Sequence, residues 1–228
     1  MNKLAGRMVR INRVQNRTEA LLYLQKHNLV AAHAYLSIEN GSGRLPYHNN
    51  DHALTVVKWC GRLQSMIPDW TLTSIRGMLL GATLHDIHHS GGKRPDTDNV
   101  SDALDTLVQF VGIHNREFSS VEIDVAVKCI QCTVFPFAVN PETYEQKIIR
   151  DADILQSIDV DFENILGEQL RQEIIVSRGA NVTRKQFAEG ELAFLDTVQM
   201  HTEPGAVLWA AAKPVLVERF TQLAEGIK

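Results

Sequence analysis

The chain contains little cysteine, and this scarcity excludes a disulfide framework. Its 228 residues include three cysteines, an odd number, at Cys60, Cys129 and Cys132. Such usage is typical of a reducing compartment, so we expect a cytoplasmic protein. Cys129 and Cys132 form one C-x-x-C pair, but a cysteine zinc site needs a second pair, which the chain lacks. We therefore expect the three thiols to be buried and structural.

Long apolar runs and a positive net charge are also missing. No run approaches the roughly 20 apolar residues of a membrane helix, and the net charge of −4 gives no overall basic surface for nucleic acid. Positive charge gathers before the first acid, Glu19, at Lys3, Arg7, Arg10, Arg13 and Arg17. This segment lacks the apolar core of a secretory signal. Residues 1–17 are predicted to form a solvated basic helix or a frayed terminus.

The sequence also lacks the patterns of sheets, repeats and linkers. No alternating segment is long enough for a strand, apart from an ambiguous stretch at 133–137. Internal repeats and low-complexity tracts are absent. A hydrophobic content of 44% over 228 residues is enough for one large core. We therefore predict a single all-α domain over residues 1–228, a bundle of about eight to ten helices.

Helical periodicity accounts for most of the chain. Thr71 is suited to cap one helix, and Pro204 fits the first turn of the last one. Glycine and proline mark loops at 39–46 and 91–96. The predicted helices begin near residue 16 and continue over 29–36, 49–66, 71–85, 98–111, 121–133, 141–157, 162–176, 183–200 and 204–226.

The most informative stretch is an apolar helix that ends in histidines and a carboxylate. The polar residues there are His85, Asp86, His88 and His89. Helical spacing places His85 and His89 on one face, one turn apart. Burying imidazole and carboxylate groups together is costly unless something binds them. One reading is a metal site, and the other is a helix end whose carbonyls are capped by imidazoles.

Two further stretches could supply partners for these residues. His48 and His52 are four residues apart near a predicted helix start, so their side chains can point into the same space. Asp153 follows an alanine and precedes apolar residues, which predicts that it faces inward, whereas we expect Asp151 at the surface. Two imidazoles and two carboxylates make a metal site with open positions for water and substrate. A shared carboxylate could also hold a second ion.

Taken in order, these residues resemble the HD-domain metal-dependent phosphohydrolases. Their four-ligand signature is matched by His52, His85, Asp86 and Asp153. Within that superfamily, the first stretch is similar to the Y-H-N-x-x-H-A motif of class I cyclic-nucleotide phosphodiesterases, matched by Tyr47, His48, Asn49, His52 and Ala53. The second is similar to their H-D-x-x-H-x-G motif, matched by His85, Asp86, His89 and Gly91. With Ala152 and Asp153 as a third element, the match spans roughly residues 45–155.

The resemblance implies a fold, a reaction and a set of roles. The fold would be the compact helical bundle of the phosphodiesterases. The four ligands would bind one transition metal ion such as Zn, Mn, Fe or Ni, and Asp86 would bridge to a second Mg or Mn ion. A metal-bound hydroxide would attack phosphorus, and His48 would be the general acid that protonates the leaving oxygen. His89 and Asn49 would orient ligands or solvent.

The implied substrate is a small phosphorylated molecule, a nucleotide by resemblance, and a homodimer is compatible with the family. The phosphodiesterases hold a purine with a glutamine followed three residues later by a phenylalanine. The best local fit is Glu191 and Phe194, but a carboxylate only accepts hydrogen bonds, and Phe194 could equally belong to the core. Lys93, in a glycine-rich loop, could place a cation near a phosphate, or it could belong to a solvated turn.

Other branches of the superfamily fit less well. Hydrolases of guanosine tetraphosphate carry Glu-Asp where this chain has His88 and His89. Di-iron oxygenases and HD-GYP enzymes need two more histidines before the last aspartate, and the chain offers His114 alone. We keep as alternatives a nucleoside 5′-monophosphatase, an iron-dependent oxygenase of the same fold, and a non-catalytic nucleotide sensor. His88 has no assigned role.

Overall fold

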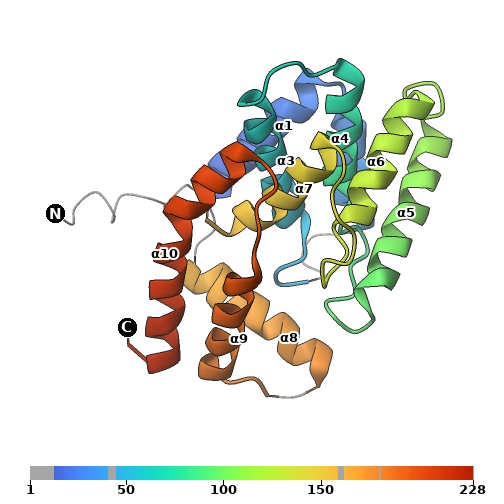
Figure 1. The fold of residues 1–228 in the computed structure, drawn as a ribbon. Coiled ribbons are helices and arrows are strands. Elements are labelled where there is room, and N and C mark those ends of the chain that lie inside the picture. Colours follow the sequence, from blue (N-terminus) through green and yellow to red (C-terminus); the bar gives the residue numbers. More distant parts are fainter. Residues whose placement is uncertain (1–12, 41–44, 159–161, 180, 228) are drawn as a thin grey trace.

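The computed structural model describes residues 13–40, 45–158, 162–179 and 181–227 (Figure 1). Within these ranges the chain forms helices joined by loops, with no strand, which confirms the all-α prediction. The elements are α1 (Arg13–Lys26), α2 (Val30–Glu39), α3 (Asn50–Ser65), α4 (Leu72–Leu84), α5 (Asp96–Ile113), α6 (Ser120–Cys132), α7 (Tyr144–Leu155), η2 (Gln156–Ile158), η3 (Phe162–Leu170), α8 (Arg171–Arg178), α9 (Arg184–Thr197) and α10 (Glu203–Glu225).

Helix α3 lies at the centre of the bundle and packs against α1, α4 and α7. Its side chains are buried almost all the way around, as expected of a helix in the core. Even Lys58 is fully buried, and its Nζ donates a hydrogen bond of 2.9 Å to Asn16 Oδ1 on α1. This central helix begins two residues before His52, so the candidate site starts from the most enclosed element.

Helices α4 and α6 approach each other closely because glycines line the contact. A Cβ atom at Gly77 would lie 2.7 Å from the carbonyl oxygen of Glu122, and one at Gly81 would lie 2.9 Å from Cys129 Cβ. Real Cβ atoms do not reach such distances without a shift of the neighbouring helix. The close contact buries Cys129, and all three cysteines are free and buried as predicted.

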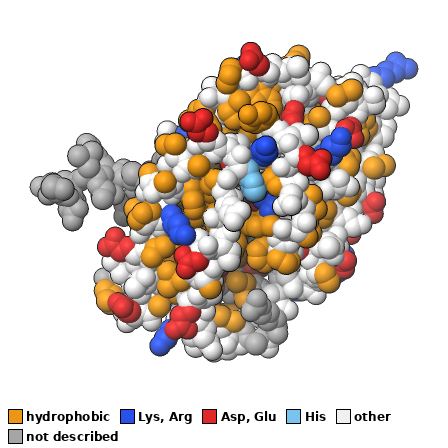
Figure 2. Space-filling view, in the orientation of Figure 1, with side chains coloured by type: hydrophobic (Ala, Val, Ile, Leu, Met, Phe, Trp, Pro, Cys, Tyr) orange, Lys and Arg blue, Asp and Glu red, His pale blue; other side chains and the backbone are white. Residues whose placement is uncertain are grey.

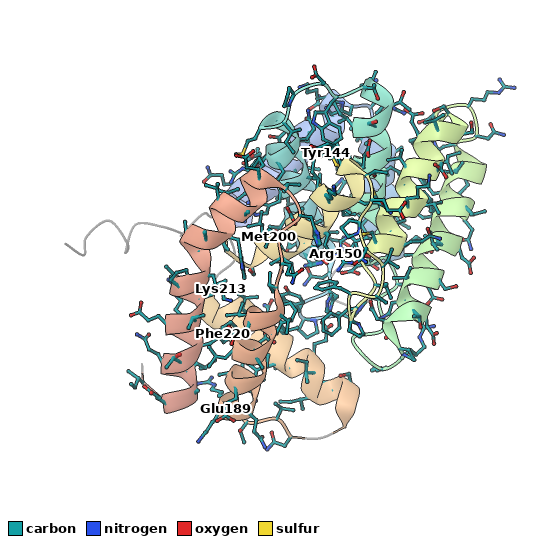
Figure 3. The ribbon with its side chains drawn as sticks, viewed as in Figure 1. Tyr144, Arg150, Glu189, Met200, Lys213 and Phe220 are labelled. Atoms are coloured by element: carbon teal, nitrogen blue, oxygen red, sulfur yellow. The ribbon has the colours of Figure 1, made fainter. Side chains whose placement is uncertain are left out.

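The remaining helices form the two ends of the bundle (Figure 1). Helices α5 and α6 lie side by side at one end, and α8, α9 and α10 gather at the other. Phe220, on α10, is buried where α10 meets α9 and lies 6.1 Å from the ring of Phe187 (Figure 3). On the face shown in Figure 2, acidic, basic and apolar side chains are interspersed, without a large area of one charge.

Asp151 is buried, contrary to the expectation that it lies at the surface. Its side chain is 0% exposed and accepts hydrogen bonds of 2.8 Å from the backbone N–H groups of His201 and Thr202. The carboxylate on α7 therefore holds Thr202, the N-cap residue of α10. A Cβ atom at Gly205 would lie 2.3 Å from Asp151 Oδ2, so only glycine fits there. Sequence pattern could not show this contact, because its partners lie fifty residues away.

The loop between α6 and α7 replaces the ambiguous strand at 133–137. Arg150, on α7, donates hydrogen bonds of 2.7 Å to the carbonyl of Cys132 and 2.6 Å to that of Val139. Its guanidinium also lies 3.8 Å from the ring centroid of Phe137 (Figure 3). The loop is thus held by side-chain contacts rather than by strand pairing. Helix α7 begins at Tyr144 rather than 141, because Thr143 forms a capping box with Gln146.

The basic N-terminus is only partly described. Residues 1–12, with Lys3, Arg7 and Arg10, lie outside the described residues, while Arg13 and Arg17 belong to α1. Among the helices that the structure describes, none combines the length and the apolar character of a membrane span.

Candidate metal centre

The four residues predicted as metal ligands come together from three helices. His52 lies in the first turn of α3, His85 and Asp86 follow the last turn of α4, and Asp153 lies in α7. His52 Nε2 is 3.0 Å from Asp86 Oδ2 and 3.4 Å from Asp153 Oδ1. His85 Nε2 is 3.3 Å from His52 Nε2, 3.3 Å from Asp86 Oδ2 and 3.9 Å from Asp153 Oδ1. Four donor side chains thus face one small volume.

The hydrogen bond behind His85 orients it as a ligand. Its Nδ1 lies 2.9 Å from the carbonyl oxygen of Ala82. A carbonyl can only accept, so Nδ1 carries the proton, and in the neutral ring the lone pair of Nε2 points at the group. A backbone carbonyl behind one ring nitrogen is the usual support of a metal-binding histidine. The donor set and its orientation therefore fit a divalent cation.

In the group of His52, His85, Asp86 and Asp153, the two carboxylates favour a positive charge beside them. Burial disfavours a charged His52, but Asp153 and Asp86 outweigh it and raise the pKa of His52 to about 10. Burial likewise opposes ionisation of Asp86, yet His85 and His52 hold the pKa of that carboxyl well below its usual range. Without a metal, protons on the imidazoles balance the carboxylates. A divalent ion would replace those protons.

Asn49 fixes the start of α3 and with it the direction of His52. Its Oδ1 accepts hydrogen bonds from the backbone N–H groups of Asp51, at 2.9 Å, and His52, at 3.4 Å. Its Nδ2 donates to the carbonyls of Leu45 and Pro46. This is an N-cap that also holds the preceding loop. Asn49 therefore supports both histidines of the first motif through the backbone.

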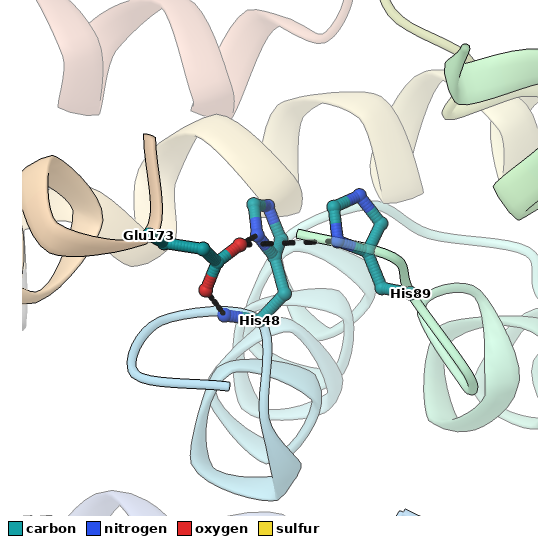
Figure 4. A group of neighbouring side chains, drawn as sticks. All are labelled: His48, His89 and Glu173. Carbon is teal, nitrogen blue, oxygen red and sulfur yellow. Dashed lines mark hydrogen bonds and ion pairs between the residues drawn. The ribbon is translucent and has the colours of Figure 1, made fainter. Parts of the chain in front are cut away.

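A second group lies beside the first and includes a residue that the sequence did not reveal. Glu173, on α8, pairs through Oε1 with His48 Nδ1, and the same oxygen is 3.9 Å from His89 Nδ1 (Figure 4). Its Oε2 accepts the backbone N–H groups of Tyr47, at 3.0 Å, and His48, at 3.1 Å. The rings of His48 and His89 lie 3.9 Å apart. Glu173 thus holds His48 and the loop that carries it, and its carboxylate lies beside the ring of His89.

No motif marked Glu173, which lies 125 residues from His48. In the structure Glu173 packs against Gly91, the last residue of the second motif. Gly91 has φ +67°, and a Cβ atom there would lie 3.2 Å from Glu173 Cγ and 2.9 Å from Leu45 Cδ2. The glycine therefore meets a backbone requirement and also leaves room for the carboxylate.

The two histidines after Asp86 have different surroundings. His89 Nε2 is 3.4 Å from Asp96 Oδ1, and its Nδ1 accepts the backbone N–H of Gly91 at 3.1 Å. Burial opposes its charge, but the hydrogen bond to Asp96 and the charge of Asp86 raise the pKa of His89. His88, with φ +61°, faces α2 instead, and its Nε2 is 3.7 Å from Glu39 Oε2.

The residues expected to bind substrate lie in three settings. Lys93 is exposed on the loop before α5. Glu191, on α9, is half-buried, and burial raises its pKa to about 7. Phe194, one turn further on, lies 5.9 Å from the ring of Phe135 and 6.5 Å from that of Phe137. Their role in binding stays a prediction.

His114 belongs to neither group. At the end of α5 it pairs with Glu117 at 2.9 Å. The described residues therefore contain two clusters able to hold a metal ion, one of His52, His85 and Asp153 with Asp86 beside them, and one of His48, His89 and Glu173. No protein-family model matches the chain, and no curated protein matches it.

Proposed function

We propose that the protein is a metal-dependent phosphohydrolase that cleaves a phosphoester of a nucleotide or another small phosphorylated metabolite. The observation that carries this proposal is the meeting of His52, His85, Asp86 and Asp153 in one volume, with the His48–Glu173 pair beside them. The ring of His48 is 5.4 Å from that of His52, so a proton donor adjoins the proposed metal. Metal-assisted hydrolysis needs these two components side by side.

In this proposal His52, His85, Asp86 and Asp153 hold a transition metal ion such as Zn, Mn, Fe or Ni. By the resemblance, Asp86 would also share a second Mg or Mn ion. The metal, when bound, would lower the pKa of water and polarise a phosphoryl oxygen. The carbonyl of Ala82 keeps His85 in the tautomer that can bind, and the cap of α3 keeps His52 pointed at the same volume.

His48 would supply a proton to the leaving oxygen. Glu173 occupies Nδ1 of the ring, which leaves Nε2 to face the substrate. Burial, followed by the nearby charge of His89, lowers the pKa of His48, whereas the bond to Glu173 raises it. The net effect lowers the pKa of His48 below its ordinary value, so a donor of this kind would work best on the acidic side of neutral pH. Glu173 acts through His48 and is a positioning residue, much as a carboxylate orients the histidine of a catalytic triad.

The substrate would extend from the metal towards α9. Glu191 differs from the amide that a purine pocket would use, but a carboxyl with a pKa of about 7 is partly protonated at neutral pH. In that form it donates as well as accepts. Phe194 and the two phenylalanines near it would offer a ring surface for a flat group. Lys93, exposed in its loop, would meet phosphate only if the substrate reaches it.

The proposal is tested by metal content together with a substrate panel. Protein purified without chelator should carry about one or more divalent ions per chain by elemental analysis. With Mn, Mg, Ni or Zn it should hydrolyse at least one of three substrates: a cyclic nucleotide, a nucleoside 5′-phosphate or an aryl phosphodiester. Asp153→Ala should abolish activity and remove the ion held by His52, His85, Asp86 and Asp153. His114→Ala, at a histidine outside both clusters, should change neither.

The same experiment separates the alternatives. Release of phosphate from nucleoside 5′-phosphates alone would favour a monophosphatase. Oxygen consumption with Fe(II) would favour an oxygenase, and nucleotide binding without turnover would favour a sensor. A folded protein that holds no metal and is indifferent to Asp153→Ala would overturn the proposal.

A further inference from the structure

The His48–His89–Glu173 cluster has the composition of a metal site in its own right. Its three donor atoms lie within 4.8 Å of one another. Two imidazoles and one carboxylate are the ligands of zinc sites that leave a position open. The Glu173 side chain is 3% exposed and that of His89 is 8% exposed. His48, at 23%, keeps an opening to solvent, so an ion has a path to the cluster.

The Nδ1 atoms of His48 and His89 each take part in one hydrogen bond, which a bound cation would replace. The backbone N–H groups of Tyr47 and His48 bind Oε2 of Glu173, which leaves Oε1 directed at the imidazoles. His89 Nδ1 accepts a single N–H, from Gly91, so it is unprotonated in this arrangement. Figure 4 shows the carboxylate directed at both imidazoles, which stand side by side. Their planes differ by 33°, and the rings would turn for both Nδ1 atoms to face one ion.

The donor types also set which ion would bind. Imidazole-rich sites prefer borderline ions such as Zn²⁺, whereas Mg²⁺ prefers oxygen ligands. The first cluster offers two carboxylates, at Asp86 and Asp153, and the second offers one, at Glu173. The preference for Zn²⁺ over Mg²⁺ is therefore expected to be stronger at the second cluster than at the first.

We propose that His48, His89 and Glu173 form a second, inhibitory site for Zn²⁺ or a similar borderline ion. An ion bound to His48 Nδ1 displaces the proton that this nitrogen shares with Glu173. The ring can then no longer become an imidazolium, and its remaining N–H is a far weaker acid. Zinc binding and proton donation by His48 are mutually exclusive. The inhibition rests on the proposed function, whereas the binding does not.

Binding is tested on a variant whose first cluster is disabled. Asp153→Ala combined with His85→Ala, followed by equilibrium dialysis against Zn²⁺, should retain one equivalent of the ion. Adding Glu173→Gln or His89→Ala should remove that equivalent, while adding His88→Ala, at the neighbouring histidine that faces α2, should not. Co²⁺ in place of Zn²⁺ should give visible absorption bands that follow the same pattern. Circular dichroism of each variant identifies any that has failed to fold.

Inhibition is tested on the wild-type protein loaded with Mn²⁺. Added Zn²⁺ should stop turnover while the bound Mn²⁺, measured after dialysis, stays in place. The turnover that remains in His89→Ala, whatever its size, should resist this inhibition, whereas turnover by His88→Ala should not. Zinc that binds equally well after Glu173→Gln and His89→Ala would overturn the second site, and inhibition that tracks loss of Mn²⁺ would overturn its inhibitory role. If no substrate is turned over, the proposed function fails, and the dialysis still decides whether the site exists.

Discussion

At the scale of single residues, the contact between His48 and Glu173 is the one with the largest expected effect on the proposed reaction. A carboxylate with a 3% exposed side chain is held by two backbone N–H groups and faces two imidazoles. Burial raises the pKa of Glu173, but the bond to His48 and those from the backbone outweigh it and keep the pKa below its ordinary value. Glu173 is therefore an anion whose charge acts on His48.

The substitution Glu173→Gln should lower kcat by about 10²-fold or more and change KM little, because the ring loses its orienting charge. Glu173 raises the pKa of His48, so its loss lowers that pKa. The alkaline limb of the rate profile, where His48 loses the donated proton, should move to lower pH. Activity measured from pH 5 to pH 9 checks this. Glu168→Gln, at a carboxylate paired with Arg171, is the control, and a slow variant with an unmoved profile would argue for plain structural damage.

Residue-level chemistry was predictable where the partners lie close together in the sequence. His48 with His52, and His85 with Asp86, follow from spacing, and the convergence of these residues with Asp153 agrees with the resemblance. Glu173 and Asp151 were missed for one reason. Each is a carboxylate whose partners are backbone N–H groups far away in sequence. Nothing in the local pattern distinguishes such a residue from a solvated acid.

At the scale of elements, Glu122 joins two helices with one carboxylate. Its Oε1 accepts from Arg76 Nε at 2.6 Å, which links α6 to α4. Its Oε2 accepts from the backbone N–H of Ser119, which completes the capping box of α6. Arg76 also donates to the carbonyls of His27 and Glu117. A single carboxylate therefore fixes both the start of α6 and its packing on α4.

This arrangement predicts how stability depends on pH. Burial opposes ionisation of the Glu122 carboxyl. The hydrogen bonds from Ser119 and Arg76 outweigh burial and lower the pKa of Glu122 below its ordinary value of 4.5. Its contribution is therefore complete above pH 4.5 and is lost as the pH falls through the lower, folded-state pKa. Glu122→Gln should reduce the free energy of unfolding at pH 7 by about 3 kcal/mol, and the difference from wild type should shrink towards pH 3.

Urea unfolding at several pH values measures that difference. Asp124→Asn removes a solvent-exposed pair with Lys128 on the same helix and serves as the control, with little expected change. An equal loss for Glu122→Gln at pH 3 and pH 7 would contradict the electrostatic account.

The helices themselves were predictable because apolar periodicity and capping residues are local. Helix α3 was expected at 49–66 and spans Asn50–Ser65, and α6 was expected at 121–133 and spans Ser120–Cys132. The loop at 133–137 was ambiguous because its apolar residues predict burial but do not indicate which backbone conformation the segment adopts. Its conformation depends on Arg150 and on Asp96, which accepts the N–H of Phe135 at 2.6 Å. Both lie outside the loop.

At the scale of the whole molecule, the first cluster joins α3, the end of α4 and α7 at one point. Without a cation, the carboxylates of Asp86, after α4, and Asp153, on α7, face the same small volume. An ion that binds only the folded chain stabilises it by mass action. We expect the metal to stabilise the packing of these three helices in addition to its proposed role in the reaction.

Removing the metal should therefore lower the unfolding temperature. At an ion concentration of about 100 times Kd, binding contributes about 2.7 kcal/mol, which corresponds to roughly 5–10 °C for a chain of this length. Thermal unfolding with and without chelator, followed by circular dichroism, checks this shift. With Mg²⁺ as the ion, which the imidazole-rich second cluster disfavours, His85→Ala should unfold at one temperature in both conditions. A chelator effect of equal size in that variant would mean that the ion binds elsewhere.

The separation of 125 residues between His48 and Glu173 also bears on synthesis of the chain. At translation speeds of about 5–20 residues per second, His48 is made roughly 6–25 seconds before its partner. The metal-binding side chains, the last of which is Asp153, are all made before Glu173. The orienting carboxylate of His48 is therefore the last of these groups to be made, and His48 gains it only when α8 docks.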